Sequence, residues 1–194
     1  MRILALCGSL RAASYNRQLV QYATTLAPTS AHLVTYRDLR RIPPFSEDDE
    51  DHPPAAVHDL RAAIAAADAV LLATPEYNGS VPGQLKNALD WASRPFPDNV
   101  LRDKPAAVMG ASPSPSGAAR AAGEARVVLA RAGAHVLDDA VQVPHAYQQL
   151  DPAGGMADAA LSDQLTELLD ALAGAVSPTA EGAAMAPVGA ACPQ

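Results

Sequence analysis

Short apolar runs alternate along the chain with longer segments in which apolar residues recur every three or four positions. The short runs predict strands, and the longer segments, rich in alanine and leucine, predict amphipathic helices. The predicted strands span residues 2–7, 32–36, 69–74, 105–111 and 134–138, with a weak continuation at 141–143. The predicted helices span residues 16–26, 55–67, 83–92, 116–132 and 157–172.

This alternation of strands and helices predicts an α/β fold, a parallel sheet with helices on both faces. The run 69–73 is apolar throughout, as expected for a strand that is buried on both sides. The pattern predicts one domain over residues 1–174. The remaining residues, 175–194, are rich in alanine, glycine and proline, and we expect this tail to pack weakly or not at all.

One segment, residues 42–54, departs from the rhythm because it combines four prolines with an acidic run. A cation site is one interpretation, but the prolines prevent a compact set of ligands. A solvated loop that leads into the second helix is therefore expected, and the chain predicts no metal site.

Composition narrows the possible partners. The 194 residues are 49% hydrophobic and 18% charged, with a formal net charge of −7, which argues against a nucleic-acid or anionic-membrane surface. There are two cysteines, too few for a disulfide scaffold, and Cys7 in the first strand is expected to be buried. No apolar run approaches the ~18 residues of a membrane-spanning helix, so a cytoplasmic protein is expected.

The loop after the first strand, 8-GSLRAASYN-16, is unusually rich in hydrogen-bond donors. It leads into a helix, whose backbone N–H groups and positive end favour an anion. Ser9, Ser14 and Asn16 add neutral donors, and Arg11 adds a charged one. The loop lacks the Gly-Lys-Ser/Thr of a Walker loop and the glycine pattern of dinucleotide sites, so it predicts a site for one terminal phosphate. The alternative is a capped turn with a solvated arginine.

A second loop lies in 74-TPEYNGSVPGQLKNALDW-91, after the third strand. Asn-Gly at 78–79 and Pro-Gly at 82–83 predict two tight turns that expose Tyr77. Backbone N–H and C=O groups beside the Tyr77 ring are suited to bind the edge of a planar heterocycle. Leu85, Leu89 and Trp91 are expected to be ordinary core residues.

These two motifs, G-S-L-R-x-x-S-x-N and T-P-E-Y-N-G-S-x-P-G-x-L-K-N-A-x-D-W, resemble those of the NADPH-dependent FMN reductase family, which includes quinone, chromate and azo-dye reductases. The resemblance runs from residue 1 to about residue 172 and includes 143-VPHAYQQLDPAGGMAD-158. It implies a flavodoxin-like fold with five parallel strands in the order 2-1-3-4-5. It also implies noncovalently bound FMN, NADPH or NADH as co-substrate, a small-molecule electron acceptor, and a homodimer or homotetramer.

The resemblance also implies roles for particular residues. Those that would grip the FMN phosphate are Ser9, Arg11, Ser14 and Asn16, and those that would hold the isoalloxazine and ribityl part are Pro75, Glu76, Tyr77 and Asn78. A third loop, at 110–123, stands where the family has a glycine-rich turn against the pyrimidine end. Here Ser114 and Pro115 intrude, which leaves Ser112 and Gly117 as the candidates.

Hydride transfer from NAD(P)H to flavin N5 needs no acid/base triad, so no catalytic side chain is predicted. Glu76 is expected to brace its loop. The five histidines need no catalytic role, and most are expected at the surface, with His145 the one to follow in the structure. Two other functions remain open. One is a flavodoxin-type electron carrier without NAD(P)H activity, against which Arg11 argues, and the other is a family member specialised for a biosynthetic reduction.

Overall fold

Five parallel strands form the central sheet of the computed structural model, which describes residues 1–151 and 153–176. The strands are β1 (Arg2–Cys7), β2 (His32–Tyr36), β3 (Ala69–Thr74), β4 (Pro105–Ala111) and β5 (His135–Val143). They lie in the order β2-β1-β3-β4-β5, which confirms the predicted order. The chain passes from β1 to β2 on one side of β1 and then crosses to β3 on its other side, so the strand order reverses between β1 and β3. Ligands of open parallel sheets bind beyond the carboxyl ends of the strands at this point.

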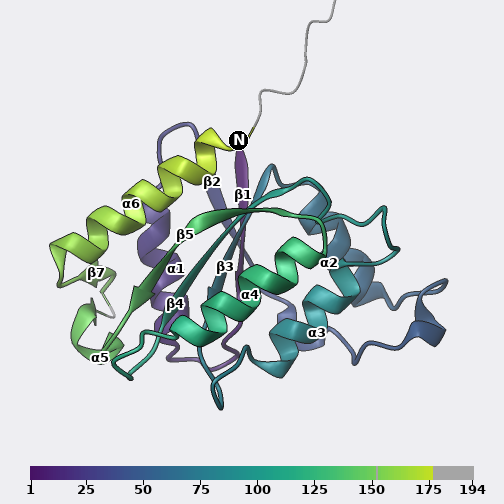
Figure 1. Ribbon diagram of the computed structural model, residues 1–194, viewed down its shortest axis with the longest axis horizontal. Helices are drawn as coiled ribbons and strands as arrows, with labels where there is room; N and C mark the ends of the chain where they lie inside the picture. Colours follow the sequence, from purple (N-terminus) through teal and green to yellow (C-terminus); the bar gives the residue numbers. More distant parts are fainter. Residues whose placement is uncertain (152, 177–194) are drawn as a thin grey trace, which may run out of the picture.

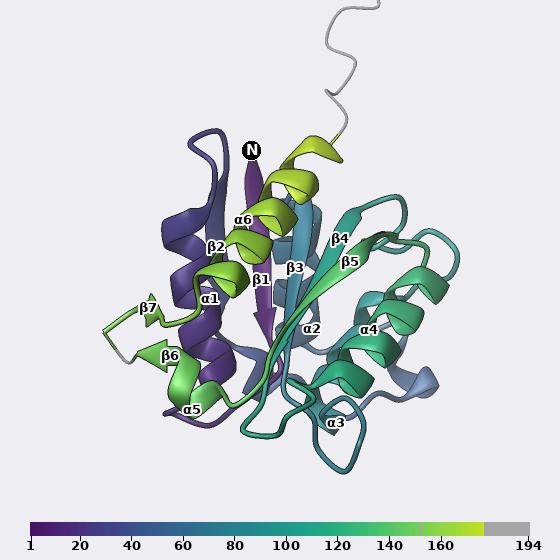
Figure 2. The ribbon, with the colours of Figure 1, turned by 60° about the vertical axis from the view of Figure 1, so that its left-hand side comes forward.

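Helices cover both faces of the sheet (Figures 1 and 2). On one face lie α1 (Tyr15–Leu26) and α6 (Ala159–Gly174), and on the other lie α2 (Ala55–Ala65), α3 (Gly83–Ala92) and α4 (Ala119–Arg131). Every residue of β3 is buried. Successive side chains of a strand point to opposite faces, so Leu71 packs with α1 and α6 while Leu72 packs with the other three helices.

The predicted core residues and the ends of the helices can be compared directly with the structure. Cys7, Leu85, Leu89 and Trp91 are buried, as predicted. The fourth long helix begins at Ala119 rather than at residue 116, because Gly117 and Ala118 both have positive φ, of 59° and 72°. That backbone cannot continue a right-handed helix. The last helix runs over Ala159–Gly174 rather than 157–172.

The fifth strand is longer than predicted. It runs without a break through Asp138 and Asp139, both exposed, where the apolar pattern is interrupted. It lies at an edge of the sheet, where one side of the strand is free of neighbours and polar side chains reach water. Its pairing with β4 shifts register between Ala106 and Val108. After it come a short helix α5 (Ala146–Gln149) and a small hairpin of β6 (Leu150–Asp151) and β7 (Gly155–Met156), none of which was predicted.

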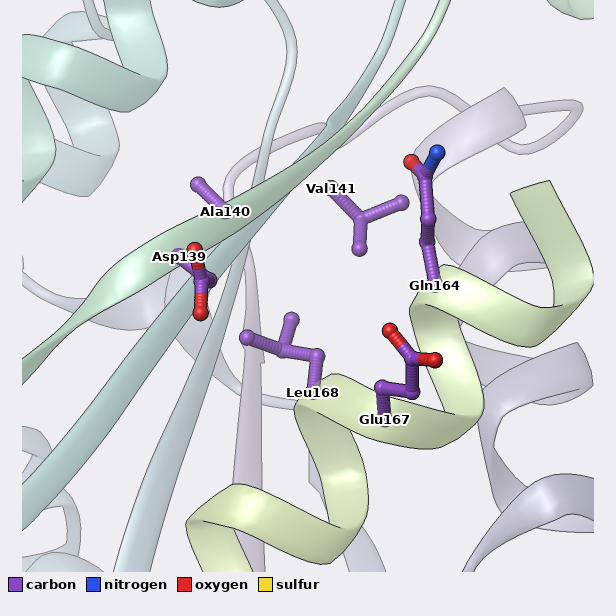
Figure 3. Close-up of a pocket in the computed structure, with 6 residues that line it drawn as sticks. All are labelled: Asp139, Ala140, Val141, Gln164, Glu167 and Leu168. Atoms are coloured by element: carbon purple, nitrogen blue, oxygen red, sulfur yellow. The ribbon is translucent and has the colours of Figure 1, made fainter. Parts of the chain in front are cut away.

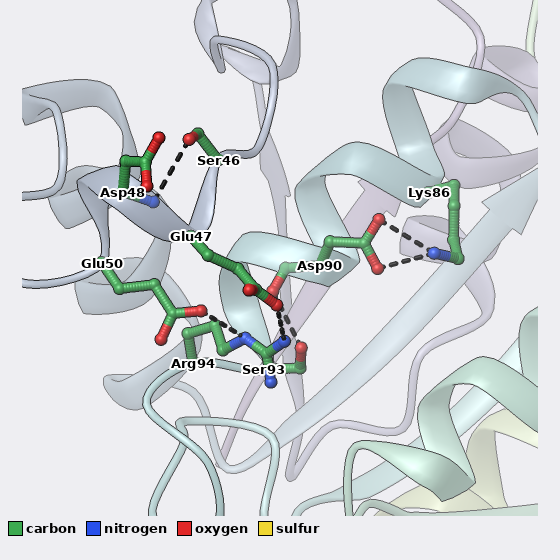
Figure 4. A network of polar contacts seen from close by, with 8 residues as sticks. All are labelled: Ser46, Glu47, Asp48, Glu50, Lys86, Asp90, Ser93 and Arg94. Carbon is green, nitrogen blue, oxygen red and sulfur yellow. Dashed lines mark hydrogen bonds and ion pairs between the residues drawn. The ribbon is translucent and has the colours of Figure 1, made fainter.

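The first part of the proline-rich segment 42–54 is less solvated than predicted. The segment lies between the 3₁₀ helix η1 (Leu39–Arg41) and α2, and it contains a second 3₁₀ helix, η2 (Glu47–Asp49). Ile42 is buried. The side chain of Asn87, on α3, bonds to the backbone of Phe45 and Pro43, at 2.7 and 2.8 Å. Figure 4 shows the acidic run reaching Arg94, whose guanidinium lies 2.7 Å from the Glu50 carboxylate. Glu50 is therefore paired with protein charge, whereas Asp48, Asp49 and Asp51 are exposed, as expected for a solvated loop.

The described chain ends shortly after α6. Val176 is half-buried and packs against the core between the sheet, α1 and α6. The predicted tail, from residue 177 onward, lies outside the described residues. Among the described helices, none combines the length and the apolar character that crossing a membrane requires.

Candidate functional site

A cavity of about 400 Å³ opens beyond the carboxyl ends of β1, β3 and β4. Its volume falls within the range of small-molecule sites in proteins. It is bordered by the loops after these three strands, two of which flank the point where the strand order reverses. The residues that line it are Ser9, Arg11, Ser14, Tyr15, Asn16, Pro75, Glu76, Tyr77, Ala111, Ser112 and Pro113.

The first loop, part of which lines this cavity, has backbone N–H groups that are not used within the fold. None of the N–H groups of residues 9–16 donates a hydrogen bond to another group in residues 1–151 or 153–176. Ser14 caps α1, where its Oγ accepts a bond from the N–H of Arg17 at 3.3 Å. The Arg11 guanidinium lies over the Tyr15 ring, 5.3 Å from its centroid. Free N–H groups at a helix start, together with one cation, form an anion site.

Asn16 has a structural task in the same loop. Its Nδ2 donates to the carbonyl of Ala111 at 2.8 Å, and its Oδ1 accepts from the N–H of Ala111 at 3.0 Å. The side chain is 2% exposed, so water does not compete with these bonds. Asn16 thus joins the first loop to the end of β4. Only its second Nδ2 hydrogen and its backbone N–H can still donate to a ligand.

Glu76 braces its loop against α4. Its Oε2 accepts from the N–H groups of Arg120, at 3.0 Å, and Ala121, at 3.3 Å. These N–H groups belong to the first turn of α4, which lacks a side-chain cap of its own because Ala118 stands at the cap position. A carboxylate near a helix N-terminus is favourable. Glu76 is engaged in this contact and is no free base.

A two-residue turn presents Tyr77 at the rim of the cavity. The backbone of Tyr77 and that of Ser80 exchange hydrogen bonds of 3.0 and 3.1 Å. Asn78 and Gly79 between them both have positive φ, 54° and 78°, as a type I′ turn requires. On α4, Glu124 accepts bonds from Ser80 Oγ and the N–H of Val81, at 2.6 and 3.2 Å. The turn is therefore fixed at both ends, and the Tyr77 side chain is 50% exposed.

The third loop is held by close backbone packing. A Cβ on Gly117 would lie 2.9 Å from the backbone nitrogens of Val143 and Pro144, so only glycine fits there. Three serine hydroxyls form a chain: Ser112 Oγ lies 3.0 Å from Ser114 Oγ, which lies 2.9 Å from Ser116 Oγ. The Ser112 end of this chain faces the cavity.

The structure thus brings eight of the ten predicted site residues to one cavity. Asn78 forms the turn behind Tyr77, and Gly117 lies against the end of β5, so neither of them lines it. Tyr15, Ala111 and Pro113 line the cavity and were not predicted. Tyr15 is the first residue of α1, directly after the capping Ser14, and this position at the start of the helix is the sequence signal that could have identified it. His145 has positive φ, 46°, beside α5 and does not line the cavity.

A separate cavity of about 230 Å³ lies between β5 and α6 (Figure 3). The carboxylates of Asp139 and Glu167 border it together with Gln164. No lysine or arginine of the described chain lines it, so it differs in charge from the first cavity, which Arg11 borders. Within the described residues, no three His, Cys, Asp or Glu side chains gather as a metal site would need.

Comparisons with known proteins identify a family for this chain. The family model described as NADPH-dependent FMN reductase matches residues 1–148. An NAD(P)H-dependent FMN reductase of Pseudomonas aeruginosa is 40% identical over 175 residues, covering 89% of this chain and 93% of that protein. A 2-hydroxy-1,4-benzoquinone reductase of a Burkholderia species is 41% identical over 130 residues, covering 67% and 70%.

A solved structure gives the same result for the fold. The flavoenzyme NAD(P)H:(acceptor) oxidoreductase FerB of Paracoccus denitrificans superposes with a TM-score of 0.80 at 33% identity, covering 90% of this chain and 96% of that one. With the family model matching most of its length, this chain belongs to the NADPH-dependent FMN reductase family.

Proposed function

We propose that the protein holds FMN in the cavity beyond β1, β3 and β4 and uses it to pass electrons from NAD(P)H to a small oxidised acceptor. The observation that carries this proposal is the loop at residues 9–16, with its free N–H groups and Arg11 on the same cavity as Tyr77. When bound, FMN supplies the hydride-accepting position and the electrons for the acceptor. The protein supplies binding and orientation.

The phosphate would be held by the N–H groups of the first loop, by the hydroxyls of Ser9 and Ser14, and by Arg11. Ser9 and Ser14 are almost fully buried, whereas Arg11 is exposed at the mouth. Asn16 fixes the distance between this loop and the third loop through its two bonds to Ala111. A phosphate held by the first loop would therefore lie at a fixed distance from the part of the cofactor that contacts the third loop.

The isoalloxazine would lie against the Pro75–Tyr77 segment, with Ser112 at the opposite wall. Glu76 and Glu124 hold the turn behind Tyr77 in one conformation. The exposed Tyr77 leaves one side of the cavity open, which is where a nicotinamide or a flat acceptor can approach. A quinone is the acceptor we propose, and the Burkholderia relative, named a benzoquinone reductase, supports this choice.

We also propose a homo-oligomer in the cytoplasm, acting without nucleic acid or membrane. An apolar groove of about 620 Å³ runs between the Tyr77 turn and α4, and it includes Val81, Val127 and Val128. Val127 is 59% exposed there. A second copy seated on this groove would cover these valines beside the flavin. Val127→Glu should then reduce the oligomer measured by light scattering, whereas Ala62→Glu, at an exposed position of α2 that does not line the groove, should not.

Anaerobic titration of the FMN-loaded protein with NADPH or NADH tests the function. We expect two-electron bleaching of the flavin, followed by reoxidation on addition of a benzoquinone. A flavodoxin-type carrier would bind FMN but would not be reduced by either nucleotide. Tyr77→Ala should keep FMN and change the rates of reduction or reoxidation. Tyr147→Ala, which removes an equally exposed ring away from the cavity, is the matched control.

A further inference from the structure

A second polar cavity lies on the other side of the first loop, between α1 and the end of β2. Its volume is about 450 Å³, and Ser9 borders both this cavity and the flavin cavity. The strand pairing explains the location, because Leu6 pairs with Tyr36 and the two following loops therefore leave the sheet side by side. Figure 2 shows β2 beside α1 at this edge. The lining residues are Cys7, Ser9, Leu10, Arg17, Gln21, Thr35, Tyr36, Arg37 and Leu39.

Two guanidinium groups of this lining are unpaired with carboxylates. In residues 1–151 and 153–176, no Asp or Glu oxygen lies within 4.0 Å of the side-chain nitrogens of Arg17 or Arg37. The neighbouring Asp38 pairs instead with Arg41, at 3.3 Å. Arg40 donates to the carbonyl of Leu10 at 3.0 Å and so ties the two loops together. The cavity therefore has an excess of positive charge in a chain whose net charge is −7.

The remaining lining suits an anion. The hydroxyls of Ser9 and Thr35 and the amide of Gln21 are further donors. The Tyr36 side chain is not part of this donor set, because it packs on the other face of the sheet, and burial together with the nearby Asp38 and Asp59 raises the pKa of its hydroxyl. Burial raises the pKa of the Cys7 thiol, which keeps it neutral near pH 7, so it adds no competing negative charge. Guanidinium forks and hydroxyls are the groups that bind phosphate oxygens.

We propose that this cavity binds the adenosine half of NADPH and that Arg17 and Arg37 recognise its 2′-phosphate. The inference rests on the proposed function, since it assigns the second nucleotide of the same reaction. The loop after β2 lies two strand spacings, about 10 Å, from the loop after β3 that carries Tyr77. A dinucleotide with its nicotinamide at Tyr77 must bring its adenosine half across such a distance. The cavity is also larger than a lone phosphate needs.

Binding of two non-redox probes to the FMN-loaded protein, measured by calorimetry, tests the site. Adenosine 2′,5′-bisphosphate should bind at least about tenfold more tightly than adenosine 5′-monophosphate, the effect of one charge-assisted hydrogen bond. Arg37→Ala and Arg17→Ala should each remove most of that preference. In steady state, both variants should raise KM for NADPH while KM for NADH stays unchanged. Arg2→Ala, which removes an exposed arginine at the opposite end of β1, is the matched control for net charge.

Equal affinity of the two probes, or a preference that survives both substitutions, would overturn the assignment. So would inorganic phosphate displacing the bisphosphate at similar concentrations, because the site would then be one for free anions. Weaker FMN binding in Arg37→Ala would place the residue in the flavin site instead. Failure of the proposed function gives a different result, since neither NADPH nor NADH would then bleach the wild-type flavin.

Discussion

Replacing Glu76 with alanine should destabilise the protein at the junction between the cofactor loop and α4. The carboxylate accepts two N–H groups at a helix start that has no other side-chain cap. Loss of a capping acceptor costs roughly 0.5–2 kcal/mol, and loss of a negative charge near a helix N-terminus roughly 0.3–1 kcal/mol. Because Glu76 is half-buried, a total of about 2 kcal/mol is reasonable, which lowers Tm by about 4–8 °C in a domain of this size.

Two further variants separate the causes. Glu76→Gln keeps an acceptor for both N–H groups and loses only the charge, so it should retain more than half of the lost stability. Glu124→Ala releases the same loop at Ser80 and Val81 without touching the start of α4, so it should lower Tm less.

Calorimetry on both apoprotein and FMN-loaded protein is the appropriate assay, because bound cofactor itself raises Tm by mass action. The apoprotein gives the structural cost, and the additional loss in the loaded protein gives the weakened FMN affinity. An unchanged Tm in Glu76→Ala would refute the capping role. A loss in Glu76→Gln as large as that in Glu76→Ala would show that the charge alone matters.

Four other outcomes are expected. Arg11→Ala should weaken FMN binding about ten- to a hundredfold, from roughly 1.5–3 kcal/mol for a charged hydrogen bond, with riboflavin affinity nearly unchanged in fluorescence titrations; equal losses for both flavins would contradict a phosphate contact. Gly79→Val should cost roughly 1–2 kcal/mol in denaturant unfolding because its φ is +78°, although a Cβ there would meet nothing closer than Arg120 Nη1 at 3.7 Å. Truncation after Val176 should leave Tm and flavin content unchanged, and a drop of several degrees would show that the removed residues contribute to the fold. In a Cys192→Ser background, Cys7 should react with iodoacetamide far more slowly in the native protein than in urea, because burial raises the pKa of its thiol. Raising the pH through the unfolded pKa of ~8.5 should also lower the free energy of unfolding, since the native thiol stays protonated there.

Local sequence determined much of this fold. The buried strands β1, β3 and β4 are short apolar runs that are unfavourable to expose to water. Their predicted bounds agree with the structure. The Asn78-Gly79 turn follows equally from local chemistry, because these residues tolerate positive φ. The residues of the three loops were predicted to share a site because parallel strands bring their carboxyl ends to one edge of the sheet.

Only the tertiary structure decided what those residues do to one another. Asn16 and Ala111 are 95 positions apart, and no local pattern shows that the Asn16 amide is committed to that backbone. The same holds for Glu76, whose partners are N–H groups 44 and 45 residues away. The late start of α4 depends on Gly117 packing against the end of β5, and the length of β5 depends on its place at the sheet edge. A hydrogen bond or a close contact between distant segments is set by how the helices and strands pack, whereas the sequence pattern specifies only which face of each is apolar.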